Sequence, residues 1–141
     1  MYNFKNDYSE GAHPRILDKL IATNLVQQLG YGEDEYAQEA KAVLKEKLSN
    51  QAATIHFVSG GTQTNLLVIS FLLRVHEAVI SAKTGHIAAN ETGAIEATGH
   101  KVITTETIDG KLRPEDVAEV LAAYALAPHV VKPRIVYISN S

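Results

Sequence analysis

The apolar positions in the first part of the chain recur at helical spacing. Residues 13–28 begin with Pro14, which suits a first helical turn, and residues 35–48 repeat the pattern after a polar, glycine-containing loop. In both segments the apolar side chains fall on one face, as in an amphipathic helix. These faces consist of Leu17, Leu20, Ile21 and Leu25 in the first segment, and of Tyr36, Ala40, Val43, Leu44 and Leu48 in the second.

After residue 50, short apolar runs alternate with helical patterns. The runs are rich in β-branched side chains and predict strands at residues 54–58, 77–82, 101–106 and 133–139. The segments between them predict a largely buried helix at 66–75, a short helix at 89–99 that ends at Gly99, and a helix that begins at Pro114. This alternation indicates the α/β class, with a parallel-rich sheet and helices on both faces. Ligands of such sheets bind beyond the carboxyl ends of the strands.

Composition and charge narrow the possible partners. The chain has 141 residues, of which 45% are hydrophobic, and its formal net charge is -3. Its Lys and Arg residues are scattered, so a basic stripe for nucleic acid is missing and no basic face suits a membrane surface. The N-terminus has no signal-peptide pattern, and no apolar run reaches the roughly 18 residues that span a bilayer. We therefore expect a cytoplasmic protein without nucleic-acid or membrane partners.

Several kinds of site find no support in the sequence. The absence of cysteine excludes disulfides and thiolate metal ligands. The six histidines show no spacing such as H-x-x-x-H, so we predict no metal site. Ser59 precedes two glycines, but the G-x-S-x-G pattern of a nucleophilic serine is not present.

The segment "FVSGGTQTN", residues 57–65, is a candidate phosphate site. Gly60 and Gly61 allow a sharp turn with accessible N–H groups, and Thr62 or Thr64 can cap the following helix. Unpaired amides at a helix start attract phosphate. Because the Walker lysine and the dinucleotide spacing are missing, a monophosphate fits best. The alternative is a plain strand–helix connection, in which glycine serves the geometry alone.

The turn is one of several motifs that occur together in a fixed order. They are "FKNDYSEGAHPRIL", "GYGEDEY", "HFVSGGTQTNLLVIS", "AVISAKTGHIAANETGAIEATGHK" and "TIDGKLRPEDV". From residue 3 to its end, the chain resembles the low-specificity L-threonine aldolases. These belong to the β-eliminating lyase group of pyridoxal-phosphate enzymes, with the aspartate-aminotransferase fold (fold type I). The resemblance implies an N-terminal helical arm and helices at residues 1–50. Residues 51–141 would form the first half of the cofactor-binding large domain.

The resemblance also assigns cofactor-binding and catalytic residues. Gly60, Gly61 and Thr62 match the family's phosphate motif, usually Ser-Gly-Thr, so Gly60 lacks a hydroxyl contact. His86 matches a histidine that stacks on the cofactor ring and assists proton transfer, although a lone loop histidine is more often solvated or capping. Glu91 matches a carboxylate of the proton relay. It could equally be an acid that the start of a helix favours.

Further matches concern the substrate side. Asn6 and Asp7 fall on the family's Ser-Asp pair, where Asn6 could donate to the substrate carboxylate and Asp7 could be only a structural cap. Tyr31 matches a residue near the active site that is contributed across a dimer interface, or it is a surface tyrosine. Asn65 matches the phosphate region, or it is a polar residue near a helix start. Lys83 stands where relatives more often carry an acid.

The function implied by the resemblance is cleavage of L-threonine-like β-hydroxy-α-amino acids to glycine and an aldehyde, with pyridoxal 5'-phosphate as cofactor, in a homodimer or homotetramer. The family's Schiff-base lysine and carboxylate-binding arginine come later in its chain than residue 141. We therefore expect this chain to be the N-terminal portion of a longer enzyme and to be inactive alone. A β-eliminating lyase acting on another amino acid, or a non-catalytic truncated α/β module, remains an alternative.

Overall fold

The structure is a computed structural model that describes residues 6, 8–126 and 128–139. Its backbone contacts divide the chain into two compact units, Met1–Phe57 and Val58–Ser141. Asp7 lies outside the described residues. The predicted division between residues 50 and 51 concerns the domains of the complete fold and stays a prediction.

The first unit contains the helices α1 (Pro14–Thr23) and α2 (Glu35–Lys47). Each is capped at its start, by the ring of His13 and by the carboxylate of Asp34, which accept backbone N–H bonds from the first turn. The first helix was predicted to reach residue 28, but α1 ends at Thr23, where the backbone N–H of Asn24 donates to the carbonyl of Ile21 and closes a tighter last turn. Neither helix contains a buried residue. The predicted apolar faces are therefore exposed.

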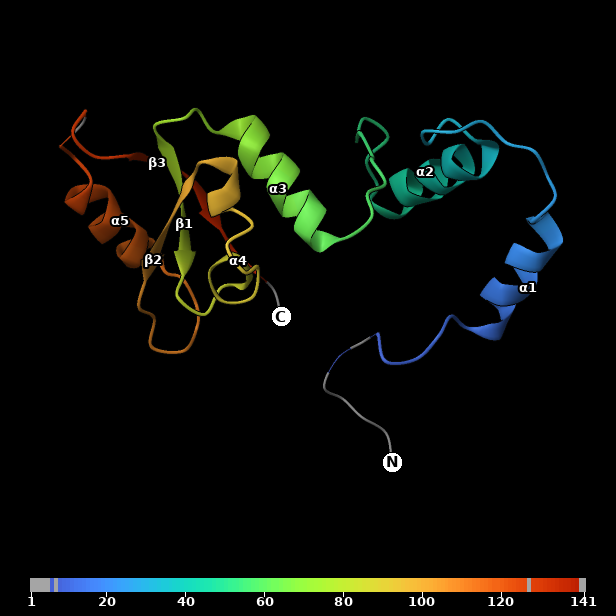
Figure 1. The fold of residues 1–141 in the computed structure, drawn as a ribbon, viewed down its shortest axis with the longest axis horizontal. Coiled ribbons are helices and arrows are strands. Elements are labelled where there is room, and N and C mark those ends of the chain that lie inside the picture. Colours follow the sequence, from blue (N-terminus) through green and yellow to red (C-terminus); the bar gives the residue numbers. More distant parts are fainter. Residues whose placement is uncertain (1–5, 7, 127, 140–141) are drawn as a thin grey trace. The chain divides into compact units, whose positions relative to one another are not determined.

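The second unit contains a sheet of three parallel strands in the order β2-β1-β3 (Figure 1). Its elements are α3 (Gly61–Leu72), β1 (Glu77–Ala82), α4 (His86–Ala89), the 3-10 helix η1 (Glu96–Thr98), β2 (Lys101–Thr105), α5 (Pro114–Ala123) and β3 (Lys132–Tyr137). Parallel strands joined by helical crossovers confirm the predicted α/β class.

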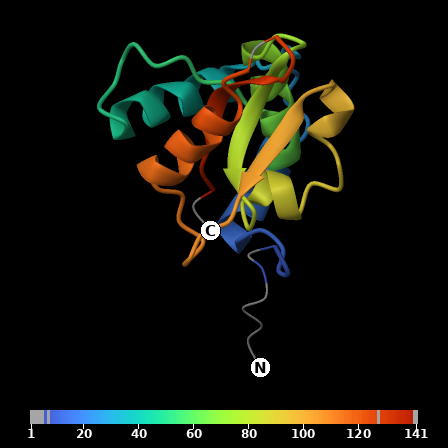
Figure 2. The same cartoon turned by 90° about the vertical axis from the view of Figure 1, so that its left-hand side faces the viewer.

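Helices cover both faces of this sheet, as Figure 2 shows with α5 on one side and α3 with α4 on the other. Successive residues of β1 point to opposite faces and enter two separate cores. One core consists of Ile69, Leu73, Val79, Ile87 and Ile95. The other consists of Ala78, Ile80, Ile103 and Val120. The sheet thereby holds the loops that follow β1 and β3 in fixed positions.

Two predictions about the start of the α/β pattern are wrong. Residues 54–58 do not form a strand, because a strand requires a paired neighbour and none of the described residues pairs with them. The helix predicted at 66–75 begins earlier, at Gly61, and is not largely buried. Ile69 is its only buried residue, whereas Phe71 is 87% exposed, because the described residues pack against one face of α3 only.

The helix predicted at 89–99 is replaced by α4, a turn and η1. Thr92 and Gly93 have φ values of 48° and 80°, which interrupt a right-handed helix. Gly99 does end η1 as predicted, with φ of 85°. Among the described residues, no helix has the length and apolar character needed to cross a membrane.

Candidate active site

The glycine turn leaves open space around the first amides of α3. Gly60 is the N-cap and provides no side-chain hydrogen bond, so the amides of Gly61 and Thr62 keep their donors. A Cβ added at Gly60 or Gly61 would meet no atom within 4 Å. Gly60 has φ of 173°, an extended conformation open to any residue. Neither backbone strain nor packing within the chain requires glycine here, and the turn fits a bound phosphate.

Side chains around the turn stabilise its shape. The side-chain oxygen of Gln63 accepts hydrogen bonds from the backbone and hydroxyl of Ser59, at 2.7 and 2.8 Å. The hydroxyl of Thr64 donates to the carbonyl of Gly60 at 3.1 Å. The predicted capping by Thr62 or Thr64 is therefore wrong, because the helix starts earlier than expected and Gly60 occupies the cap position. The Thr62 side chain is exposed.

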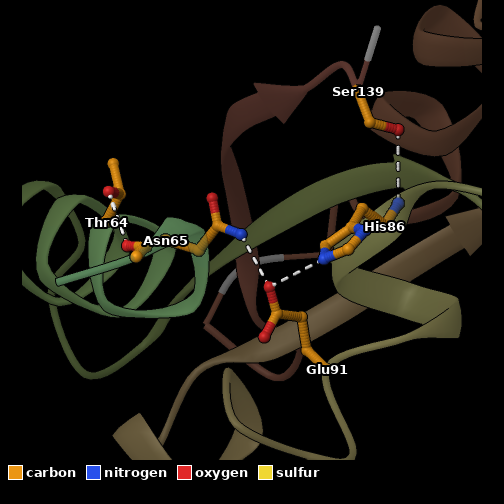
Figure 3. A network of polar contacts seen from close by, with 6 residues as sticks. Thr64, Asn65, His86, Glu91 and Ser139 are labelled. Carbon is orange, nitrogen blue, oxygen red and sulfur yellow. Dashed lines mark hydrogen bonds and ion pairs between the residues drawn. The ribbon is translucent and has the colours of Figure 1, made fainter. Parts of the chain in front are cut away.

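The second part of the site is a buried carboxylate with two partners, shown in Figure 3. The side chain of Glu91 is 2% exposed, and its Oε1 lies 3.2 Å from Nε2 of His86. The same oxygen accepts a hydrogen bond from Nδ2 of Asn65 at 2.8 Å. The structure thus brings Asn65, His86 and Glu91 together from separate segments. Glu91 does not lie in a helix, so its reading as a first-turn acid is wrong.

The position of His86 is also set by Ser139, which the sequence analysis did not single out. The backbone N–H of His86 donates to Oγ of Ser139 at 3.2 Å (Figure 3). Ser139 follows β3, and His86 follows β1, so both lie at the carboxyl ends of parallel strands. The place of Ser139 at the carboxyl end of the strand predicted at residues 133–139 was the signal that could have identified it.

A hollow of about 590 Å³ borders the same edge of the sheet. Gly85 and Ser139 contribute to its wall, together with Tyr137 and residues 109–112 of the loop after β2. The imidazole of His86 is 47% exposed. An exposed imidazole that faces a buried carboxylate with one ring nitrogen has its other ring nitrogen available for a ligand.

Lys83 forms an ion pair with an exposed carboxylate. Its Nζ lies 2.6 Å from Oε1 of Glu106, and both side chains are exposed. The hydrogen bond that Lys83 donates to Glu106, and then the negative charge of Glu106, raise the pKa of Lys83 above its ordinary value. This ion pair links the end of β1 to the segment after β2.

Asn6 and Tyr31 belong to the first unit. The Oδ1 of Asn6 accepts hydrogen bonds from the backbone of Tyr8 and the hydroxyl of Ser9, at 3.2 and 2.6 Å. Both bonds use the side-chain oxygen of Asn6, so the side-chain N–H groups of Asn6 take no part in them. Tyr31 is fully exposed and has φ of 63°. The substrate-binding roles of both residues stay predictions. Over the described part of the chain, no group of three His, Asp or Glu side chains is placed to hold a metal.

The parallel sheet, the open turn at the head of α3 and the pair at the carboxyl ends of the strands are typical of one class, the α/β proteins that bind their ligands beyond the carboxyl ends of parallel strands. The sequence profile of the beta-eliminating lyase family matches residues 7–141. The chain therefore belongs to the beta-eliminating lyase family, as its motifs predicted.

Individual relatives agree with this assignment. The solved structure of threonine aldolase from Leishmania major matches with a TM-score of 0.94 and 50% identity, over 99% of this chain and 41% of that protein. Low specificity L-threonine aldolases of Pseudomonas sp. (strain NCIMB 10558) and Pseudomonas aeruginosa are 30% and 26% identical over 98% of this chain. The chain spans 40% of the length of these two relatives. Its sheet and helices are those of the N-terminal part of the threonine aldolase structure, which confirms the predicted fold type I.

Proposed function

We propose that the protein to which this chain belongs is a pyridoxal-phosphate-dependent lyase. Its reaction is the cleavage of L-threonine, L-allo-threonine and similar β-hydroxy-α-amino acids to glycine and an aldehyde. One observation carries the proposal: α3 begins at the open glycine turn and also bears Asn65, which contacts the carboxylate partner of His86. A phosphate at the turn and a ring near the imidazole would therefore occupy one site.

The residues present fit the cofactor. The amides of Gly61 and Thr62 and the Thr62 hydroxyl would hold its phosphate. The space beside residues 60 and 61 is open, since a Cβ added at either position would meet no atom within 4 Å. The exposed ring of His86 would lie against its pyridine ring. When bound, pyridoxal phosphate supplies the electron sink that allows the Cα–Cβ bond of the substrate to break.

His86 and Glu91 would handle the proton of the substrate hydroxyl. Because Nε2–H of His86 faces Oε1 of Glu91 at 3.2 Å, Nδ1 is the ring atom with a free lone pair. Nδ1 accepts the hydroxyl proton as the carbon–carbon bond breaks. The Glu91 carboxylate then stabilises the imidazolium, since an opposite charge at this distance favours the charged ring.

The partners and location follow from the family resemblance. We propose a cytoplasmic homodimer or homotetramer in which Tyr31 serves the site of a neighbouring subunit. The full exposure of Tyr31 supports this role. Light scattering of the purified full-length protein measures the assembly, and a monomer at micromolar concentration contradicts it.

The direct test uses the full-length protein with added pyridoxal phosphate. We expect L-threonine to yield glycine and acetaldehyde in equal amounts, and borohydride to fix the cofactor on a lysine. His86→Gln is the matched variant, which should keep the covalent adduct and lose most of the cleavage rate. Absence of any pyridoxyl-lysine contradicts the cofactor assignment. Ammonia and a keto acid from another amino acid, without glycine formation, would instead support the β-eliminating alternative.

A further inference from the structure

The side-chain amide of Asn65 connects two parts of the site that are far apart in the sequence. Asn65 lies on the second turn of α3, the helix that begins at the glycine turn. Its Nδ2 lies 2.8 Å from Oε1 of Glu91, in the segment after α4. The imidazole of His86 approaches the same oxygen from another side (Figure 3).

The chemistry of this contact suits Asn65 for orienting the Glu91 carboxylate and not for transferring a proton. A carboxylate oxygen has two lone pairs, so Oε1 can serve Asn65 and His86 at once. A neutral amide neither gains nor loses a proton near neutral pH, whereas it does form a strong, charge-assisted bond to a carboxylate. The Glu91 side chain is only 2% exposed, so water cannot replace a lost donor at full strength. Asn65 therefore restricts the carboxylate to one position.

We propose that Asn65 is a positioning residue. It holds the Glu91 carboxylate so that His86 keeps one orientation, and it transmits the position of the glycine turn at the head of α3 to the imidazole. The transmission to a bound phosphate rests on the function proposed above. The effect of Asn65 on His86 does not rest on it, and can be measured without any ligand.

The first experiment follows the ring signals of His86 by NMR in the full-length protein without cofactor. We expect Asn65→Ala to shift these signals away from their wild-type positions, because the Glu91 carboxylate loses the donor that holds it. The matched control is Val120→Ala, which shortens a buried side chain in the core on the other face of the sheet and lowers stability. Its His86 signals should stay as in the wild type. Unchanged His86 signals in Asn65→Ala would overturn the proposal.

A second comparison distinguishes positioning from a general packing role. Asn65→Asp keeps the size and shape of the side chain, but it replaces the donating amide by a second carboxylate beside Glu91, and the repulsion between the two should displace His86. We expect the His86 signals of Asn65→Asp to move at least as far as those of Asn65→Ala. Wild-type His86 signals in Asn65→Asp would assign the contact to packing and contradict the proposal.

The last measurement concerns the link to the phosphate turn, with pyridoxal phosphate as the probe. We expect Asn65→Ala to weaken its binding roughly tenfold, the order expected for loss of one hydrogen bond to a charged group. If the affinity for pyridoxal phosphate is undiminished while the His86 signals are displaced, the proposed link to the phosphate turn is wrong and the positioning of His86 by Asn65 stands. If the wild type binds no cofactor while the His86 signals still depend on Asn65, the proposed function fails and the positioning role stands.

Discussion

The ring nitrogen Nε2 of His86 lies 3.2 Å from Oε1 of Glu91, a carboxylate that is almost entirely buried. The two residues are only five positions apart, yet they do not share a regular helix. α4 stops at Ala89, Asn90 has left the helical conformation with φ of -124°, and Glu91 lies in the bend that follows, from which its carboxylate contacts the imidazole. The pair consists of one buried carboxylate and one exposed imidazole.

Replacing Glu91 by Gln removes the charge but keeps the shape. We expect kcat for threonine cleavage to fall about 100-fold or more, the usual range for loss of acid–base assistance, with a smaller change in KM. The matched control is Glu106→Gln, an exposed carboxylate bonded to Lys83, which should leave both constants within about twofold. Steady-state kinetics of the full-length protein measure this, and equal effects of the two substitutions contradict the role of Glu91.

Gly60→Ser adds a hydroxyl at the start of the candidate phosphate turn. A Cβ there meets no atom within 4 Å, and serine is a favourable N-cap, so stability should be unchanged or rise by a few tenths of a kcal/mol. We expect tighter binding of pyridoxal phosphate, measured by absorbance titration. Gly60→Ala is the control, because it adds the Cβ without the hydroxyl. Equal affinities in the two variants would show that the added hydroxyl does not reach the phosphate.

Gly99→Ala is expected to lower the free energy of unfolding by about 1–2 kcal/mol, because alanine is strained in the left-handed conformation. Gly99 has φ of 85° where η1 ends. Gly61→Ala is the matched substitution, at a helical position with free space, and should not destabilise. Urea unfolding measures both. Equal losses would mean that the turn after η1 relaxes without strain.

Glu77 should make stability depend on pH in the acid range. The backbone N–H of Arg74 donates to Oε2 of Glu77 at 2.8 Å, and this bond, followed by the positive charge of Arg134, holds the pKa of Glu77 below its ordinary value of 4.5. A lowered folded-state pKa stabilises the fold above pH 4.5, and this contribution is lost as the pH falls through the folded-state value.

The corresponding experiment compares Tm of the wild type and Glu77→Gln between neutral pH and pH 3. We expect a lower Tm for the variant at neutral pH and a difference that disappears on acidification. Glu119→Gln, an exposed residue of α5, is the control and should show no such trend. A pH-independent difference for Glu77→Gln would assign its effect to packing alone.

Much of the fold could be predicted from local patterns. The strands at residues 77–82, 101–105 and 132–137, the helix at Pro114 and the role of Gly99 agree closely with the predictions. Each depends on side-chain spacing or backbone conformation within a few residues. The prediction of a strand at residues 54–58 is wrong because the apolar pattern of a segment does not indicate whether a partner strand is available to pair with it. The burial of α3 failed for a similar reason, since only one row of its side chains contacts the sheet.

The sequence by itself determined the family, the α/β class and the identity of the candidate phosphate turn, His86 and Glu91, because these depend on motifs and on local periodicity. Only the tertiary structure decided that Asn65 and His86 share one oxygen of Glu91, and that Ser139 supports the backbone of His86. Those contacts join residues up to 53 positions apart. They form only when the parallel strands align their carboxyl ends, and no local pattern encodes such an alignment.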